Sequence, residues 1–147
     1  MNNALDGRSK YELTLLAKIA QQTERYEEMV TYADKLFLFD EELTSAERNL
    51  CSSAYKNVIS NRRAELKVLE SIQNKLTPKE YKEIRTTIEK YKKDIEEELK
   101  TICKRVIRLI EEKVIPAKVQ IKSAEARVFY LKMRGDFYRY LCEIDDN

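Results

Sequence analysis

Residues that break helices are almost absent from this chain, and their scarcity limits the folds that the chain can adopt. Of 147 residues, two are Gly and two are Pro. The two prolines, Pro78 and Pro116, enclose a long span without a breaker, in which a continuous helix would be about 50 Å long. Apolar residues make up 43% of the chain and charged residues 37%, which is typical of long amphipathic helices. The sequence therefore predicts an all-α fold.

Capping signals divide the chain into five predicted helices. A hydroxyl residue precedes a glutamate by three positions in Ser9–Glu12, Thr44–Glu47 and Thr77–Glu80, which is the capping-box pattern of a helix start. Together with the spacing of apolar residues, these signals predict helices at about 9–22, 26–40, 45–75, 78–114 and 119–144. Pro116 ends or kinks the fourth helix. Because the connections are short, we expect one antiparallel helical bundle in a single domain, residues 1–147.

The composition argues against several classes of function. The formal charge is +2, whereas a nucleic-acid-binding protein would need a larger excess of bases. Histidine is absent, which removes the commonest general base and the commonest metal ligand. Cys51, Cys103 and Cys142 form no CxxC pattern, so we expect reduced thiols packed in helical cores. No signal peptide or membrane-spanning run is visible. We expect a soluble cytoplasmic protein with no metal, no cofactor, and no nucleic-acid or membrane partner.

Basic residues recur at a spacing that points to anion binding. Two pairs of bases lie seven residues apart, about two helical turns: Lys56 with Arg63, and Lys132 with Arg139. Tyr140 follows the second pair directly, and Asp136 lies inside it. Ammonium, guanidinium and phenol groups are the donors that a phosphate needs. A single basic pair on a helix is most often solvated surface, and spacing alone does not show that two pairs converge.

Several longer runs resemble the 14-3-3 family: Glu24–Met29, Glu47–Leu50, Ala54–Val58, Arg62–Arg63 and Val128–Leu141. The last run, V-F-Y-L-K-M-R-G-D-F-Y-R-Y-L, is the longest and the most specific. The match extends from about Ser9 to the C-terminus, with one small insertion near Thr77. The resemblance implies the N-terminal half of the nine-helix 14-3-3 fold, so we expect a truncated domain without the helices that form the opposite groove wall.

The resemblance also implies a function and a set of site residues. It implies an adaptor in signal transduction that binds phosphoserine or phosphothreonine peptides of client proteins, without catalysis. The phosphate-binding residues are then Lys56, Arg63, Arg139 and Tyr140, and the groove-lining residues are Lys132, Asn49 and Ser53. A phosphoserine carries about −1.5 to −2 charges, which forked arginine donors suit. Ser53 replaces a valine that is usual in the family. We further hypothesise that Asp136 orients the cations and offsets their mutual repulsion.

Family members form dimers through their first four helices, and the resemblance assigns seven interface positions: Ile19, Thr23, Arg25, Glu28, Tyr91, Asp94 and Glu98. Arg25 and Glu98 match a cross-subunit ion pair. Asp94 stands where a lysine usually faces the acidic member of a second pair, so that pair is lost unless one of the two preceding lysines reaches in. Exposed ion pairs contribute only about 0–1 kcal/mol, so we expect this change to tune the choice between homodimer and heterodimer.

Alternatives to the adaptor remain open at this point. The first is a helical scaffold that dimerises but has a degenerate or incomplete phosphopeptide groove. An enzyme that uses Lys and carboxylate side chains for acid–base chemistry is another, although no motif or metal-ligand spacing supports it. A nucleic-acid-binding bundle would require a salt-dependent affinity for polyanions that the near-neutral charge does not favour.

Overall fold

The computed structural model describes residues 7–39, 41–114 and 123–145. The described residues form five α-helices: α1 (Lys10–Gln22), α2 (Tyr26–Phe37), α3 (Ser45–Lys75), α4 (Pro78–Leu109) and α5 (Ala124–Asp145). Helix α4 continues directly into a π-helical turn, η2 (Ile110–Val114). No β-strand occurs among the described residues. The predicted all-α fold and its five helices are confirmed.

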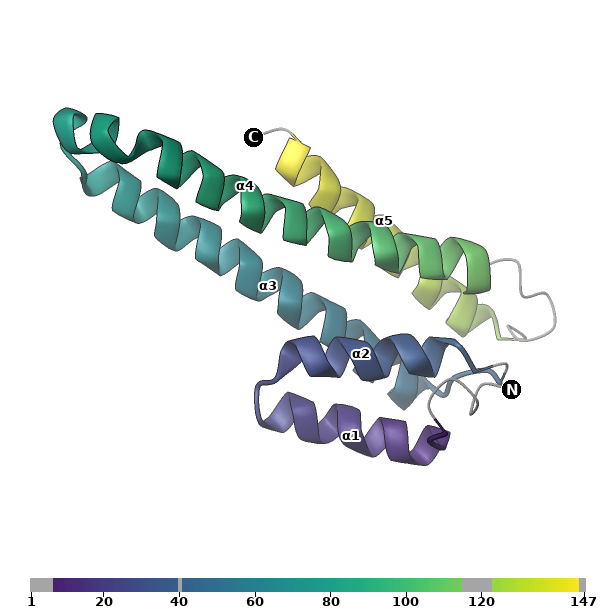
Figure 1. Cartoon of the computed structure of the whole chain (residues 1–147). Coiled ribbons are helices and arrows are strands. Elements are labelled where there is room, and N and C mark those ends of the chain that lie inside the picture. Colours follow the sequence, from purple (N-terminus) through teal and green to yellow (C-terminus); the bar gives the residue numbers. More distant parts are fainter. Residues whose placement is uncertain (1–6, 40, 115–122, 146–147) are drawn as a thin grey trace.

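The two long helices, α3 and α4, lie side by side as a hairpin (Figure 1). Helices α1 and α2 form a shorter pair that packs across one end of this hairpin, and α5 lies along α4 at the same end (Figure 1). Each helix packs against the next helix in the sequence, and α1 also packs against α3. The far end of the α3–α4 hairpin extends beyond the other three helices (Figure 1).

Local hydrogen bonds explain where the helices begin. Thr44 accepts a hydrogen bond from the backbone N–H of Glu47, and the Glu47 carboxylate accepts one from the backbone N–H of Thr44, which completes the predicted capping box of α3. Ser9 and Thr77 accept the corresponding bond from the N–H three residues later, at the starts of α1 and α4. Pro78 occupies the first turn of α4, where its missing N–H costs nothing.

The predicted helix ends differ from the structure in two places. Helix α2 ends at Phe37 and not near residue 40. The backbone N–H groups of Leu38 and Phe39 donate hydrogen bonds to the carbonyl groups three residues earlier, which is the pattern of a tighter final turn. Helix α5 begins at Ala124, after Ser123 accepts a hydrogen bond from the N–H of Ala126 at 3.3 Å. Residues 119–122 and Pro116, which also entered the predictions, lie outside the described residues.

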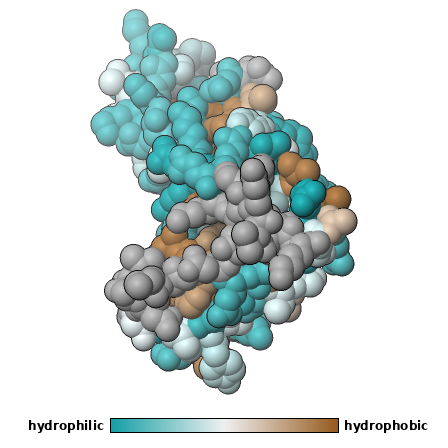
Figure 2. Space-filling model, turned by 90° about the vertical axis from the view of Figure 1, so that its right-hand side faces the viewer, coloured by the Kyte–Doolittle hydropathy of each residue, from teal (hydrophilic) through white to brown (hydrophobic). Residues whose placement is uncertain are grey.

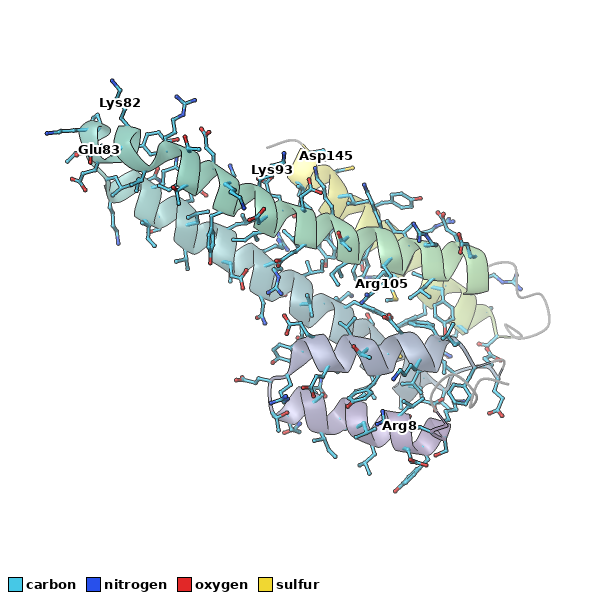
Figure 3. All side chains as sticks on the ribbon, in the orientation of Figure 1. Arg8, Lys82, Glu83, Lys93, Arg105 and Asp145 are labelled. Carbon is cyan, nitrogen blue, oxygen red and sulfur yellow. The ribbon has the colours of Figure 1, made fainter. Side chains whose placement is uncertain are left out.

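The core is built around Tyr55 of α3, which is fully buried. Its ring stacks on Phe37 of α2 at 6.2 Å and meets Phe137 of α5 edge-on at 6.4 Å. Its hydroxyl donates to Asp34 of α2 at 2.6 Å, and Asp34 pairs with Arg105 of α4 at 3.2 Å. Figure 3 shows Arg105 between α4 and α2. These contacts fix the rotation of α3 against α2, α4 and α5.

The cysteines test one further prediction about the core. All three are free thiols. Cys51 and Cys103 are buried, as predicted, and burial raises the pKa of the Cys103 thiol to about 12. Cys142 is exposed, so the prediction of core packing is wrong for this residue. Leu141, one residue earlier, packs against the core, whereas Cys142 lies on the side of α5 that faces solvent.

The surface is largely hydrophilic, and apolar side chains reach it in separate places in the end view of Figure 2. Among the described residues, ten large apolar or aromatic side chains are exposed: Tyr11, Leu15, Ile19, Val68, Ile72, Ile84, Tyr91, Val128, Leu131 and Tyr138. The first seven lie on α1 and on the far parts of α3 and α4, and the last three lie on α5. None of the described helices has the length and apolar content that a bilayer crossing requires.

Candidate functional site

Helix α3 carries its predicted site residues along one face. Asn49, Ser53, Lys56 and Arg63 follow one another at spacings of four, three and seven residues, which keeps all four on the same side of the helix. The opposite side of the helix buries Cys51, Ala54 and Val58. Because that side is held in the core, the polar row cannot rotate away, and it faces α5.

Asp136 of α5 brings bases from two helices together. Its Oδ2 atom lies 3.5 Å from Nζ of Lys56 on α3 and 3.1 Å from Nζ of Lys132 on α5. Its Oδ1 atom lies 3.6 Å from Nη2 of Arg139. The Asp136 side chain is only 17% exposed, so it lies beneath the bases that it contacts. The convergence that sequence spacing could not establish is therefore present in the structure.

Tyr140 connects the remaining guanidinium to this group. The Cζ atom of Arg63 lies 5.6 Å from the centre of the Tyr140 ring, and that of Arg139 lies 5.2 Å from the same centre. The ring itself packs edge-on against buried Phe137 at 5.3 Å, which holds the phenol in place. We call the set Lys56, Arg63, Lys132, Arg139 and Tyr140 the basic cluster.

Glu143 also belongs to this site, and the sequence analysis missed it. Its carboxylate lies 3.1 Å from Nη2 of Arg63. Glu143 follows Arg139 by four residues and Tyr140 by three, so all three lie on one side of α5. A search for acids one turn beyond each predicted site residue would have found it.

The electrostatics of the site favour an anion. Four bases and the two acids Asp136 and Glu143 leave a formal surplus of two positive charges. Burial would raise the pKa of Asp136, but the hydrogen bond from Lys132 and the charges of Lys132 and Lys56 outweigh it and lower that pKa. Asp136 is therefore ionised at neutral pH. The arrangement offers ammonium, guanidinium and phenol donors to a doubly charged oxyanion.

The remaining groove-lining residues, Asn49 and Ser53, lie N-terminal to Lys56 on α3. Asn49 is exposed and Ser53 is half-buried. Within the described part of the chain, neither side chain makes a hydrogen bond to the basic cluster. Their predicted role depends on a ligand that continues along α3, and it stays a prediction.

A cavity of about 490 Å³ adjoins the basic cluster on the side toward the far end of α3. Arg63 and Tyr140 form part of its wall, and Leu66, Leu99 and Ile144 are among the apolar residues that line it. The cluster therefore borders an open space and is not sealed by packing.

Among the described residues, no group of three or more His, Cys, Asp or Glu side chains is placed to hold a metal ion.

The neighbouring arginines Arg62 and Arg63 have different surroundings. Successive helical residues point about 100° apart, so Arg63 reaches α5 while Arg62 turns to α2 and α4. Arg62 pairs with Glu27 of α2 and with Glu98 of α4, each at 2.7 Å. It also pairs with Glu65 of its own helix at 3.1 Å. Arg62 thus ties α3 to α2 and α4 on the side away from the basic cluster, a role that the sequence did not indicate.

The seven predicted interface residues lie on α1, the α1–α2 connection, the start of α2 and α4. Ile19 is 51% exposed and Tyr91 is 62% exposed, so both apolar members are available for contact. Thr23 caps the end of α1, where its hydroxyl donates to the carbonyl of Ile19 at 2.9 Å.

The charged interface residues already have partners in their own chain. Arg25 pairs with Glu28, and Glu98 pairs with Arg62. The partner of Asp94 is Lys90, one turn earlier at 3.1 Å, and not one of the two lysines that immediately precede it. Any contact of these residues across a dimer must share or replace these pairs.

Sequence comparison relates the chain to one family of known proteins. The sequence model of the 14-3-3 protein family matches residues 16–147. A 14-3-3-like protein of Solanum tuberosum is 45% identical over 136 residues, which are 92% of this chain and 51% of the relative. The 14-3-3-like protein C of Nicotiana tabacum is 44% identical over 137 residues, covering 92% of this chain and 52% of the relative.

A relative outside plants shows the same extent of similarity. The checkpoint signal transducer rad24 of Schizosaccharomyces pombe is 45% identical over 135 residues, which are 92% of this chain and 49% of the relative. The chain thus spans about half the length of the curated relatives that it matches. From the family match over most of its length and the identity to these relatives, the chain belongs to the 14-3-3 family.

Proposed function

We propose that this chain supplies the phosphate-binding part of an adaptor that binds phosphoserine- or phosphothreonine-containing segments of client proteins and regulates them without a chemical step. The observation that carries the proposal is the convergence of Lys56, Arg63, Arg139 and Tyr140 from two helices into one cluster. Its surplus of two positive charges suits a phosphate group, which carries about −1.5 to −2 charges at neutral pH.

Each member of the cluster has a distinct part in the proposed recognition. Arg63 and Arg139 offer forked donors that match two phosphate oxygens, and Lys56 adds a compact charge beside them. Tyr140 offers a neutral hydroxyl donor. The side chains of Arg63 and Arg139 are 46% and 60% exposed, which leaves them accessible to a ligand from solution. Lys132 lies at the edge of the cluster, where it would meet residues that flank the phosphate.

A binding measurement tests the proposal directly. We expect a fluorescent peptide with one central phosphoserine to bind the chain, and the same peptide with serine to bind far more weakly. Arg63→Ala and Arg139→Ala should each weaken binding at least tenfold, because each removes a charge-assisted contact to the phosphate. Arg85→Ala is the matched control, since Arg85 is an exposed arginine of α4 that pairs only with Glu89 among the described residues. Unchanged affinity in both cluster variants would place the binding site elsewhere.

We also propose that the chain pairs with a second copy, or with a related chain, through α1 and the far part of the α3–α4 hairpin. Exposed apolar side chains on both surfaces support this proposal: Leu15, Ile19, Val68, Ile72, Ile84 and Tyr91. Burial of one such side chain contributes about 1.5–3 kcal/mol, so a few of them could hold a dimer.

Light scattering combined with the phosphopeptide titration separates the adaptor from the scaffold alternative. An adaptor binds the phosphopeptide whether or not it dimerises. A dimer that fails to bind the phosphopeptide would favour a scaffold with an incomplete groove. A cytoplasmic location and the absence of catalytic activity and of nucleic-acid and membrane partners remain predictions from the sequence and the family.

A further inference from the structure

The basic cluster contains carboxylates at the positions where a phosphate would bind. Asp136 contacts Lys56, Lys132 and Arg139 at 3.5, 3.1 and 3.6 Å, respectively. Glu143 contacts Arg63 at 3.1 Å. Every base of the cluster is therefore already paired with an acid of α5 when no ligand is bound.

We propose that Asp136 and Glu143 compete with phosphate for the bases of the cluster, and that Asp136 is the residue that limits its affinity for a phosphorylated ligand. The inference rests on the function proposed above. It assigns to Asp136 a role beyond orientation of the cations: the carboxylate stabilises the empty site and, for the same reason, opposes the ligand.

The position and charge of Asp136 predict that its carboxylate weakens phosphate binding. A phosphate that bonds to the nitrogen atoms held by Asp136 would lie about 6 Å from its carboxylate, since one ion-pair distance separates each group from the shared nitrogen. Like charges at that separation repel, and the repulsion is stronger in a partly buried site than in water. The Asp136 side chain is 17% exposed, so water screens it only in part. Removal of its charge should therefore tighten phosphate binding.

The same charge acts in the opposite direction on the folded protein. Lys56 comes from α3, whereas Lys132 and Arg139 come from α5, and the three positive groups would repel one another without Asp136. The carboxylate thus helps to hold α3 and α5 together. Loss of the Asp136 charge should therefore lower the stability of the fold and raise the affinity for phosphate. A residue with only a structural role would lower both.

The experiment compares Asp136→Asn with wild type, because asparagine keeps the shape of the side chain and removes its charge. Affinity for a peptide with one central phosphoserine is measured by fluorescence anisotropy, and thermal stability by circular dichroism. We expect affinity to rise about tenfold, as Coulomb's law gives for one charge about 6 Å from a doubly charged phosphate even at the dielectric constant of water. We expect Tm to fall by about 2–4 °C. The affinity gain should shrink at high salt, because screening weakens the removed repulsion.

Asp145→Asn is the matched control. Asp145 lies on the same helix and pairs with Lys100 at 3.4 Å, but it follows Asp136 by nine residues, about 13.5 Å along the axis. Its loss should leave phosphopeptide affinity unchanged. A gain of similar size in this control would show that net charge, and not position in the cluster, sets the affinity, and would overturn the inference.

Unchanged or weaker binding by a folded Asp136→Asn variant would also overturn the inference, because the carboxylate would then be required to orient the bases. If this variant does not fold, Glu143→Gln tests the competition at Arg63 alone and should tighten binding a few-fold, whereas unchanged or weaker binding by it would contradict the proposal. If wild type binds no phosphopeptide and the variant binds none either, the proposed function itself fails and the inference falls with it.

Discussion

The two halves of helix α3 have the same type of sequence but different surroundings. In the near half, α1, α2, α4 and α5 cover the helix, and all of its buried residues lie between Arg48 and Ile59. In the far half, from about residue 61 to Lys75, the helix packs mainly on α4, and Val68 and Ile72 are exposed. One continuous helix thus serves the core and the basic cluster at one end and offers an apolar surface at the other.

Apolar periodicity alone therefore does not identify core residues. The pattern continues along the whole helix, but burial depends on which other helices reach that part. The near half has covering helices within the chain, and the far half has only α4. The same holds for α4, where Leu99 is buried while Tyr91, eight residues earlier, is 62% exposed. An uncovered apolar surface of this kind usually marks a site of association.

The largest expected effect comes from removing matched tyrosines in the two regions. Tyr55→Ala in the near half should cost about 3–5 kcal/mol of unfolding free energy, because it leaves a large cavity in the core. Tyr91→Ala in the far region should change the stability of a monomer by no more than about 0.5 kcal/mol, because its side chain is mostly exposed. Urea denaturation at low protein concentration measures both. Similar losses would show that the far half is as well packed as the near half.

The exposed apolar residues of α1 and of the far part of the α3–α4 hairpin should contribute to dimerisation but little to the stability of the monomer. Tyr91→Glu or Ile19→Glu places a charge in the proposed interface and should weaken dimerisation at least tenfold, as measured by light scattering over a concentration series. Val128→Glu is the control, because Val128 is a 64% exposed residue of α5, outside that surface. If only Val128→Glu disrupted the dimer, the interface would lie on α5.

Acid titration should distinguish two carboxylates of the near region. The lowered pKa of Asp136 means that its ionised form stabilises the fold at neutral pH, and that this contribution is lost as pH falls below about 3.9 toward the folded-state pKa. Burial raises the pKa of Asp34 despite its bonds to Tyr55 and Arg105, so its ionisation costs stability at neutral pH and protonation relieves that cost. The Tm difference of a few degrees between wild type and Asp136→Asn should therefore shrink as pH falls below about 3.9.

Asp34→Asn provides the opposite control in the same titration. Wild type regains stability at Asp34 on acidification and this variant cannot, so the variant should lose more stability than wild type as pH falls. Parallel Tm profiles for wild type and both variants would mean that neither carboxylate contributes to the pH dependence.

The smallest expected effect concerns Gly135, within the helix that covers the near half. A Cβ atom added at Gly135 would meet nothing within 4 Å. Gly135→Ala should therefore stabilise the protein by about 0.5–1 kcal/mol, because alanine restricts the unfolded chain and favours the helix. A thermal melt measures the gain. A loss of stability would reveal a close approach to Gly135 that the structure does not contain.

Much of the fold could be predicted from local signals, whereas the convergence of the site residues could not. The capping box at Thr44 and the proline at position 78 set helix starts through bonds between near neighbours, and both are present in the structure. The convergence of Lys56 with Lys132 could not be read from spacing, and only the family resemblance predicted it. Glu143 lies one turn beyond Arg139, but only the packing of α5 against α3 shows that its partner is Arg63. Cys142 was assigned to a core that does not reach it.

Local sequence signals set where the helices form and which residues share a face of each helix. Both properties depend on neighbours within a few positions and on the 3.6-residue repeat of the helix. By contrast, the packing of the helices places Arg63 against α5 and Arg62 against α2 and α4, and it places Asp136 among three bases. This is because the rotation and placement of each helix follow from the packing of side chains such as Tyr55 against segments that are distant in the sequence. The contacts that hold the basic cluster together join residues that no local pattern connects.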